Sequence, residues 1–498
     1  MKRRAFAGSL VMTLLAANAS LAQERPNIAL IISDDQGWYG LSVQMHPDLP
    51  NSKSDFFHTP RLEELASQGM RFSDAYAPSP ACSPTRLSIQ NGMNPATNRR
   101  TKAEPIATAF NNFPLVPPNH AYPLVIQAED TTIGEVLQAA GYRTAHYGKW
   151  HLGRDEPPEA HGYDESDGPA GNELAWEWDD PDNPLDIIGM PKKALEFIRQ
   201  ANEAGQPAFV QLSALGLHGS EHASAETAAR AEARPRGELH DGVRTAAATE
   251  DLDTSVGIFM DGLDELGLSE NTYVIYMGDN GHGANQNVIP SIHPDSPAPL
   301  TGDKGNLSEG GIRVPFIIRG PGIEANSWSS VPIVGFDFFP TFAEWARIDP
   351  ADLPAGIEGG SFASVLENGG VGEVRRPREE LVFHFPHYQT GTPQSAIRLG
   401  DYKLIKYYEG NKTALFDLSN DVRERNNLAV QMPEKAAELE ALLDEYLVSV
   451  NADLPVANPD YDPAKPSGFP GRARRGADPN VIVPFNTTFD PARLYFPE

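Results

Sequence analysis

Five largely apolar runs, the first of them rich in β-branched residues, constrain the fold of this 498-residue chain more than any other feature. Helical patterns lie between them, one opening with the capping box at 132–135 and another carrying an apolar stripe over 252–266. Strands that alternate with helices predict an α/β fold with a large mixed, mostly parallel sheet sandwiched by helices. The runs are PNIALIISDDQG (26–37), AHYGKW (145–150), PAFVQLSAL (207–215), NTYVIYMGDNG (271–281) and VPFIIRG (314–320).

The character of the sequence changes near residue 376. Residues 376–450 contain short strand patterns with close turns and end in a helical pattern over 434–450. They predict a smaller C-terminal domain of antiparallel sheet plus helix. Residues 451–498 are rich in Pro and Gly, and we expect this C-terminal extension to lack regular structure. The main domain then spans 23–375.

Residues 1–22 predict a secretory signal peptide. Lys and Arg at 2–4 precede an apolar run, and Ser20-Leu21-Ala22 offers small residues for cleavage. The alternative is a buried first helix. We expect a secreted or periplasmic protein without a membrane partner, because no later stretch approaches the roughly 20 apolar residues that a membrane span needs.

Charge narrows the range of partners. The chain has 40 Lys and Arg against 68 Asp and Glu, a formal net charge of −28. We expect no nucleic-acid partner, because phosphate contacts need clustered Lys and Arg. An anionic small substrate is still allowed, since a local group of cations in a cleft can focus the field against the global sign.

Two acidic pairs follow apolar runs. Asp34-Asp35 ends the first run and Asp279-Asn280 ends the fourth. In parallel sheets ligands bind beyond the carboxyl ends of the strands. Carboxylate and amide oxygens suit a hard divalent cation, Ca²⁺ or Mg²⁺. The alternative is that these residues only form turns, where Asp is common.

Several cationic and titratable residues are also expected at the carboxyl edge of the predicted sheet. Taken singly, each could be a solvated charge or an ordinary polar residue. Together, beside a divalent metal, such a set is suited to holding a tetrahedral oxyanion, so that phosphate and sulfate esters are the candidate substrates. The residues are Arg86, Lys149, His151, His218 and Lys304.

The single cysteine, Cys82, has no partner for a disulfide within the chain. It is either a reactive site or an inert buried thiol. A tyrosine-phosphatase-like loop needs Arg six positions after the cysteine, where this chain has Ser88. What stands here is Cys82-Ser83-Pro84-Thr85-Arg86, a Cys-x-Pro-x-Arg motif. With this motif the chain resembles the type I sulfatases, formylglycine-dependent and arylsulfatase-like enzymes of the alkaline phosphatase superfamily, along nearly its full mature length.

The resemblance implies a purpose for the lone thiol. In that family a maturase oxidises the cysteine during export to formylglycine (3-oxoalanine), an aldehyde. One hydroxyl of its hydrate attacks sulfur, and the other loses its proton to expel sulfate and regenerate the aldehyde. A serine would attack as well, but its sulfate ester would be slow to hydrolyse.

The resemblance also assigns roles. It implies a calcium site with Cys82 as a further contact, Arg86 stabilising the hydrate, and Lys149 and Lys304 on sulfate oxygens. His151 would hold the hydrate and act as a base. His218 would protonate the leaving alcohol together with Lys304, although many members read Pro-His-x-Pro where this chain reads LHGS (217–220). The implied calcium ligands are Asp34, Asp35, Asp279 and Asn280.

The substrate is expected to be a sulfated carbohydrate, attacked at oligosaccharide ends. In related sulfatases the region of FHFPHY borders the cleft, so His384, His387 and Tyr388 are candidate substrate-binding residues, the alternative being an edge strand with exposed aromatics. Other functions left open are an arylsulfatase of broad range, a phosphodiesterase or phosphonate hydrolase on the same scaffold, and a binding protein without activity.

Overall fold

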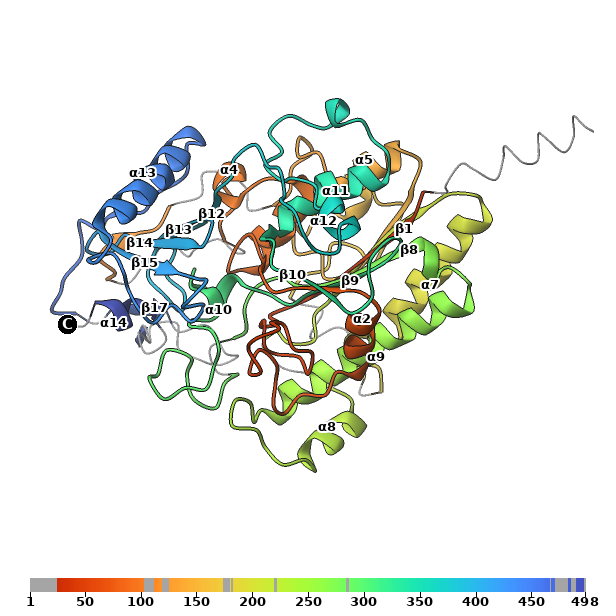
Figure 1. Ribbon diagram of the computed structural model, residues 1–498, viewed down its shortest axis with the longest axis horizontal. Coiled ribbons are helices and arrows are strands. Elements are labelled where there is room, and N and C mark those ends of the chain that lie inside the picture. Colours follow the sequence, from red (N-terminus) through yellow and green to blue (C-terminus); the bar gives the residue numbers. More distant parts are fainter. Residues whose placement is uncertain are drawn as a thin grey trace, which may run out of the picture.

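A central eight-stranded sheet organises the computed structural model, in the order β10-β2-β9-β8-β1-β7-β5-β6 (Figure 1). The structure describes residues 25–102, 112–118, 125–172, 180, 182–218, 222–283, 286–465, 467–470, 482–484 and 490–496, so the predicted signal peptide lies outside the described residues. The strands are β1 (Asn27–Ser33), β2 (Met70–Phe72), β5 (Arg143–Gly148), β6 (Glu165–Ser166), β7 (Ala208–Ala214), β8 (Thr272–Gly278), β9 (Phe316–Arg319) and β10 (Ser327–Ser329).

The sheet is mostly parallel with an antiparallel part toward one edge. β1 pairs in parallel with β7 and β8, and β7 pairs in parallel with β5. The last predicted strand becomes β9, which runs antiparallel to β8 and to β2. The large mixed sheet predicted from the alternating pattern is therefore confirmed.

Helices cover both faces of the sheet, which explains why its central strands are apolar on both sides. Ile28, Leu30 and Ile32 of β1 join one core, whereas Ala29 and Ile31 join the other. The first core includes residues of α3 (Cys82–Asn91), α5 (Ile133–Ala139), α11 (Phe338–Trp345) and α12 (Ala363–Glu367). The second includes residues of α2 (Pro60–Gln68), α7 (Gly189–Glu203) and α9 (Val243–Glu265).

A second, four-stranded antiparallel sheet follows, as predicted for the C-terminal domain. It has the order β12-β13-β14-β15, and α13 (Pro433–Ser449) packs against it (Figure 1). The short helix α10 (Glu309–Ile312) lies between this sheet and the central one (Figure 1). The strands are β12 (Leu381–Phe385), β13 (Gln394–Leu399), β14 (Tyr402–Tyr407) and β15 (Lys412–Asp417).

The C-terminal extension departs from the expectation that it lacks regular structure. Its residues Val456–Ala457 (β16) pair with Leu115–Val116 (β4), and Gly468–Pro470 (β17) pairs with Ile482–Pro484 (β18). Ala492–Tyr495 form the short helix α14, where Asp490 accepts a hydrogen bond from the backbone of Ala492. Pro and Gly limit these elements to two to four residues. The strands nevertheless form because each finds another short strand to pair with, and the Asp490 hydrogen bond supports the start of α14.

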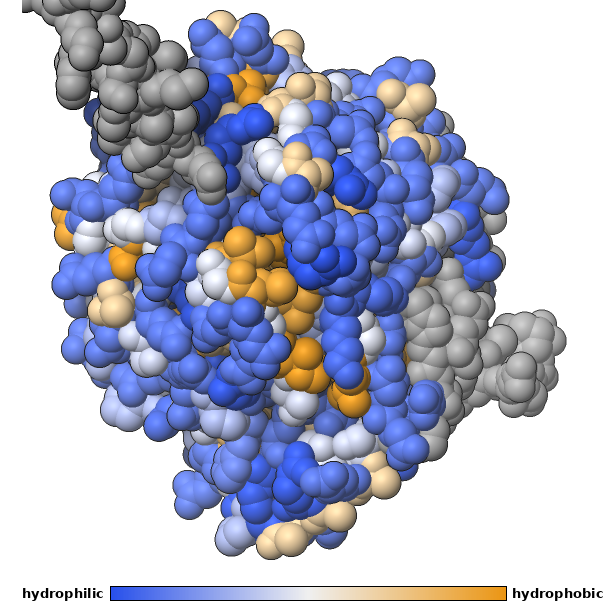
Figure 2. Space-filling view, turned by 90° about the vertical axis from the view of Figure 1, so that its right-hand side faces the viewer, coloured by the Kyte–Doolittle hydropathy of each residue, from blue (hydrophilic) through white to orange (hydrophobic). Residues whose placement is uncertain are grey.

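The surface is largely polar. Figure 2 shows the face on the right of Figure 1, where apolar residues gather in a strip within a hydrophilic surround. Among the described residues no helix is both long enough and apolar enough to cross a membrane.

Candidate active site

The carboxyl ends of β1 and β8 bring the two acidic pairs together. The two strands are neighbours, so Asp34-Asp35 and Asp279-Asn280 leave the sheet side by side. The backbone amide of Asp279 donates to Ser33 (2.9 Å), and that of Asp35 donates to Asp279 Oδ1 (3.0 Å). Asp35 has φ 56°, a left-handed conformation that turns the chain sharply after the strand.

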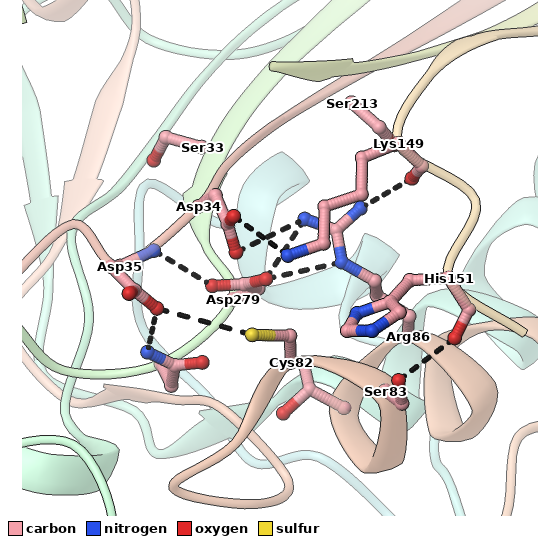
Figure 3. Close-up of polar contacts among 12 residues, drawn as sticks. Ser33, Asp34, Asp35, Cys82, Ser83, Arg86, Lys149, His151, Ser213 and Asp279 are labelled. Carbon is pink, nitrogen blue, oxygen red and sulfur yellow. Dashed lines mark hydrogen bonds and ion pairs between the residues drawn. The ribbon is translucent and has the colours of Figure 1, made fainter. Parts of the chain in front are cut away.

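Cys82 lies at the first position of α3 and faces these carboxylates (Figure 3). Its side chain is 2% exposed. Its Sγ lies 3.9 Å from Asp35 Oδ1 and accepts a hydrogen bond from Lys304 Nζ at 3.2 Å. Pro84 is tolerated because it falls in the first turn of the helix. The backbone amides at this helix start have no side-chain cap, which leaves them available to an anion.

Arg86 lies one turn along α3 and connects the acidic residues to the end of β5. Its Nε and Nη2 donate to Asp279 Oδ2 at 3.1 and 2.8 Å, and its Nη1 donates to the Lys149 carbonyl at 2.7 Å (Figure 3). Nη2 also lies 3.7 Å from Asp34 Oδ1. All these groups are buried, so Arg86 fixes the separation of the helix and the strand ends.

Lys149 and His151 follow β5. Lys149 Nζ donates to Asp34 Oδ2 at 2.7 Å, with both side chains inaccessible to solvent. His151 has φ 59°, which is unfavourable for a residue with Cβ, and its carbonyl accepts a hydrogen bond from Ser83 Oγ at 2.8 Å. Sequence reasoning missed this role of Ser83, which only its position inside the Cys-x-Pro-x-Arg motif could have indicated.

Lys304 and His218 complete the group. Lys304 Nζ lies 2.5 Å from Asp35 Oδ1, and its backbone amide donates to the His282 carbonyl at 2.9 Å. His218 follows β7 and is half-buried. Its ring lies close enough to Asp34 and Cys82 that one potential ligand atom of each falls within 4.8 Å of the others. The six candidate catalytic residues therefore lie around one point.

The pKa values of Asp34 and Asp279 are shifted in opposite directions. Burial by itself would raise the pKa of Asp34, but Lys149 and other nearby cations hold it well below its ordinary value. Burial and the charge of Asp34 raise the pKa of Asp279 to about 7, although Arg86 opposes this. Burial and Asp34 also raise the pKa of the Cys82 thiol to about 12. The unmodified cysteine is therefore a neutral thiol and a poor nucleophile.

The pKa values of His151 and His218 are both lowered. Burial lowers the pKa of His151, and the positive charge of Lys149 lowers it further. Burial also lowers the pKa of His218, although Asp34 opposes the shift. Burial would lower the pKa of Lys304, but Asp35 and other negative groups raise it well above its ordinary value. Lys304 is thus a cation beside two imidazoles whose pKa values are lowered.

The donor set fits a hard divalent cation. One ligand atom from each of Asp34, Asp35, Cys82 and Asp279 lies within 4.8 Å of the others. Asp34 Oδ1 and Asn280 Oδ1 are buried and have no hydrogen-bond partner among the described residues. Asn280 Nδ2 donates to Asp35 Oδ1 at 2.8 Å, which fixes the amide with its oxygen free for another ligand. Buried oxygens left in this way are costly unless a cation or water meets them.

The three candidate substrate-binding residues lie in the C-terminal domain and are buried. Both ring nitrogens of His384 contact protein groups, Ser395 Oγ at 2.7 Å and the Asp453 carbonyl at 2.9 Å. His387 Nε2 lies 2.8 Å from Thr101 Oγ1. The Tyr388 hydroxyl accepts a hydrogen bond from the Leu115 amide at 3.2 Å. Most of these contacts join the C-terminal domain to other parts of the chain, through Thr101, Leu115 and Asp453. Substrate contact by the three residues stays a prediction.

Fold and site together define a class of protein. It is an α/β enzyme whose strand ends gather hard-oxygen ligands and fixed cations around one buried helix start, an arrangement suited to an ester of a tetrahedral oxyanion.

Comparison with known proteins identifies the family. The sulfatase family model matches residues 26–348, and the model of the N-sulphoglucosamine sulphohydrolase C-terminal region matches residues 302–453. The chain therefore belongs to the sulfatase family and is a sulfuric ester hydrolase.

Individual proteins agree with this assignment. A sulfatase of Formosa agariphila is 29% identical, with 89% of this chain and 93% of that protein aligned. Human arylsulfatase A is 26% identical, with 94% and 95% aligned. The fold is shared with Ps i-CgsB in complex with k-i-k-neocarrahexaose (TM-score 0.67, 21% identity, 85% and 93% covered). It is also shared with BT4656 in complex with its substrate D-glucosamine-2-N,6-O-disulfate (TM-score 0.63, 19% identity, 86% and 98% covered).

Proposed function

We propose that this sulfatase is calcium-dependent, works with Cys82 converted to formylglycine, and releases inorganic sulfate from sulfated oligosaccharides. The observation that carries the proposal is the position of the Cys82 thiol at the centre of a hard-oxygen donor set, 3.9 Å from Asp35 Oδ1. Sulfur ligands suit soft metals, whereas carboxylate and amide oxygens suit Ca²⁺. An oxygen in place of Sγ makes the donor set chemically uniform.

A hydrated formylglycine at position 82 would supply the nucleophilic hydroxyl, and a bound Ca²⁺ would lower the cost of its negative charge. Asp34, Asp35, Asp279 and Asn280 would hold the ion. Magnesium is the alternative ion for the same oxygens, but it demands a stricter octahedral geometry.

The chain's own residues then bind substrate and move protons. Lys149 and Lys304 would be fixed cations for the sulfuryl oxygens, and Arg86 would stabilise the formylglycine hydrate at position 82. His151 is a neutral base whose buried Nδ1 has no hydrogen-bond partner among the described residues. A bound sulfate ester would favour the protonated form of His218, because a nearby opposite charge favours the charged imidazole. His218, half-buried at the edge of the group, would then give a proton to the leaving alcohol with the help of Lys304.

Two similarities support a carbohydrate substrate. The C-terminal match is to N-sulphoglucosamine sulphohydrolase, and BT4656 shares the fold and acts on a disulfated glucosamine. Exo action on oligosaccharide ends is part of the proposal, as are export through the signal peptide and modification of Cys82 by a maturase on the way.

The test has two parts. The protein is made with and without a formylglycine-generating maturase, and the peptide containing Cys82 is weighed by mass spectrometry. We expect an exchange of sulfur for oxygen with loss of two hydrogens, and turnover only in the converted protein. Turnover by unconverted protein would contradict the formylglycine proposal.

The second part measures sulfate released from a panel of sulfated oligosaccharides and aryl sulfates. We expect higher kcat/KM on oligosaccharides. Activity confined to aryl sulfates would contradict the carbohydrate assignment, and faster cleavage of phosphodiesters would favour the phosphodiesterase alternative. The Cys82→Ala variant is the matched blank for both parts.

A further inference from the structure

A buried cluster of charges joins α10 to the C-terminal domain, outside the catalytic centre. Its members come from the segment before Cys82, from α10 and the residue after it, from the C-terminal sheet and from the loop after β15. Six of them are at most 6% exposed, and the seventh, Asp74, is half-buried. They are Asp74, Tyr76, Glu309, Arg313, Arg398, Lys403 and Glu424.

Glu309 is the centre of this cluster. Its Oε1 accepts a hydrogen bond from Lys403 Nζ at 2.7 Å, and its Oε2 accepts from Arg313 Nε at 2.6 Å and from the Tyr76 hydroxyl at 2.9 Å. Glu424 Oε2 accepts the backbone amide of Glu309 at 2.7 Å, and its Oε1 lies 2.9 Å from Lys403 Nζ. Both the side chain and the backbone of Glu309 are therefore held by the C-terminal domain.

The holding residues are themselves constrained. Glu424 has φ 54°, a conformation that a residue with Cβ adopts only when its surroundings impose it. Lys403 lies on β14, and its side chain is fully buried between the two glutamates. Burying a lysine away from water is costly unless such partners surround it.

The backbone of α10 in turn contacts three segments that carry catalytic residues. The Ile312 carbonyl accepts the amide of Ala77, five residues before Cys82, at 2.8 Å. The Gly311 carbonyl accepts the amide of Gly281, next to Asn280, at 2.9 Å. The Gly310 amide donates to Thr301, three residues before Lys304, at 2.8 Å.

The backbone segments around α10 are packed so closely that a side chain could not fit between them. A Cβ on Gly281 would lie 1.9 Å from the Gly310 carbonyl oxygen, and a Cβ on Gly310 would lie 2.2 Å from that of Gly302. Any shift of α10 therefore moves the segments that carry Asn280 and Lys304.

We propose that Glu309 is a positioning residue: it fixes α10 against Lys403 and Glu424, and α10 fixes the separation of Cys82, Asn280 and Lys304. The C-terminal domain is then part of the active-site framework although none of the cluster touches the reacting atoms. Buried ion pairs are weak contributors to stability but impose one geometry through directed hydrogen bonds, which suits this role.

The inference deepens the proposed function, because it concerns the same site. The test compares Lys403→Met with Lys406→Met in the full-length matured protein. Lys406 lies on the same strand, and its ion pairs go to Glu440 (3.2 Å) and Asp444 (2.8 Å) of α13 instead of α10. Each variant removes one lysine charge from β14. Lys403→Met breaks the contacts to Glu309 and Glu424, whereas Lys406→Met breaks only contacts to α13.

Three quantities are measured: kcat and KM on an aryl sulfate, the Kd of Ca²⁺ by calorimetry, and hydrogen exchange of peptides covering 277–283 and 300–312. We expect Lys403→Met to lower kcat and weaken Ca²⁺ binding by about 10- to 100-fold, as loss of an outer-shell partner commonly does. Exchange in both peptides should rise. Lys406→Met should change none of these more than about twofold, the range of a surface ion pair.

The proposal is overturned if folded Lys403→Met and Lys406→Met behave alike in all three measurements. Should Lys403→Met not fold, Tyr76→Phe decides, because it keeps the ring and removes the hydroxyl that donates to Glu309 and accepts from Arg313 and Arg398. We expect its kcat to fall by about tenfold, the value of a hydrogen bond to a charged group. An unchanged kcat with unchanged exchange would refute the positioning role. If the wild type binds no Ca²⁺, the calcium proposal fails, while kcat and exchange still decide this one.

Discussion

Replacing Lys304 by alanine tests the electrostatic account of the site most directly. Lys304 Nζ lies 3.2 Å from Cys82 Sγ, so a negatively charged sulfate ester bound at position 82 would lie beside this charge. Two unit charges about 4 Å apart in a partly screened site interact by about 4 kcal/mol. Since about 1.4 kcal/mol is tenfold in rate, we expect kcat to fall by about two to three orders of magnitude.

The assay uses two substrates that differ in leaving group, an aryl sulfate with an acidic phenol and a sulfated sugar. The loss should be larger on the sugar, because its alcohol needs a proton as it leaves and Lys304 assists that transfer. Lys304→Arg keeps the charge but not the geometry, so its loss should be smaller than that of alanine. The exposed Lys192→Ala is the neutral control.

The affinity for Ca²⁺ should not fall with kcat in the alanine variant. Lys304 contacts Asp35 Oδ1 at 2.5 Å and therefore competes with a cation for that oxygen. The alanine variant should bind Ca²⁺ at least as tightly as the wild type. A kcat loss below about tenfold, or a loss of Ca²⁺ affinity that accounts for the kcat change, would refute the reasoning.

Three further predictions concern the metal, the modified residue and a remote carboxyl. Chelation of Ca²⁺ should abolish activity and lower the Tm, since an ion at 100 times its Kd stabilises the fold by about 2.7 kcal/mol; re-addition should restore both, and no change on chelation would contradict the site. Cys82→Ala should show no turnover while its Tm stays within about 3 °C of the wild type by differential scanning calorimetry, and measurable turnover would contradict the role of this side chain. Burial raises the pKa of Asp253 to about 7. The hydrogen bonds that its carboxylate accepts from the backbone amides of Arg61 and Leu62, at the start of α2, oppose this rise. Because the folded state keeps a proton that the unfolded chain releases, this group stabilises most below about pH 4 and its contribution is lost as the pH rises to 7. The Tm advantage of wild type over Asp253→Asn should therefore shrink between pH 4 and 8, and a constant difference would show that Asp253 does not titrate in this way.

The fold could be predicted from the sequence because its signals are local. Apolar runs over 26–37 and 271–281 predict strands without knowledge of their neighbours, and the capping box at Thr132 recurs in the structure at the start of α5. The strand and helix patterns over 376–450 likewise predict the small antiparallel sheet and α13. The short strands of the C-terminal extension were not, because pairs such as β16 with β4 depend on a distant edge that no local pattern reveals.

The candidate site was predictable for a related reason. Parallel strands deliver the residues after them to one edge, so Asp34 and Asp279 meet although 245 positions separate them. The same logic does not extend to the C-terminal domain. His384 and Tyr388 stand in a pattern that fits an edge strand, and only packing against other segments decides that they are buried.

By itself, then, the amino-acid order determined the α/β class, the strand ends that carry polar residues, and the Cys-x-Pro-x-Arg motif. Only the tertiary structure decided that Lys304 reaches Asp35, that Ser83 holds His151, and that Lys403 is buried against Glu309. The physical reason is the range of the information: backbone periodicity is set by residues a few positions apart, whereas the environment of a charge is set by whatever segments the folded chain packs around it.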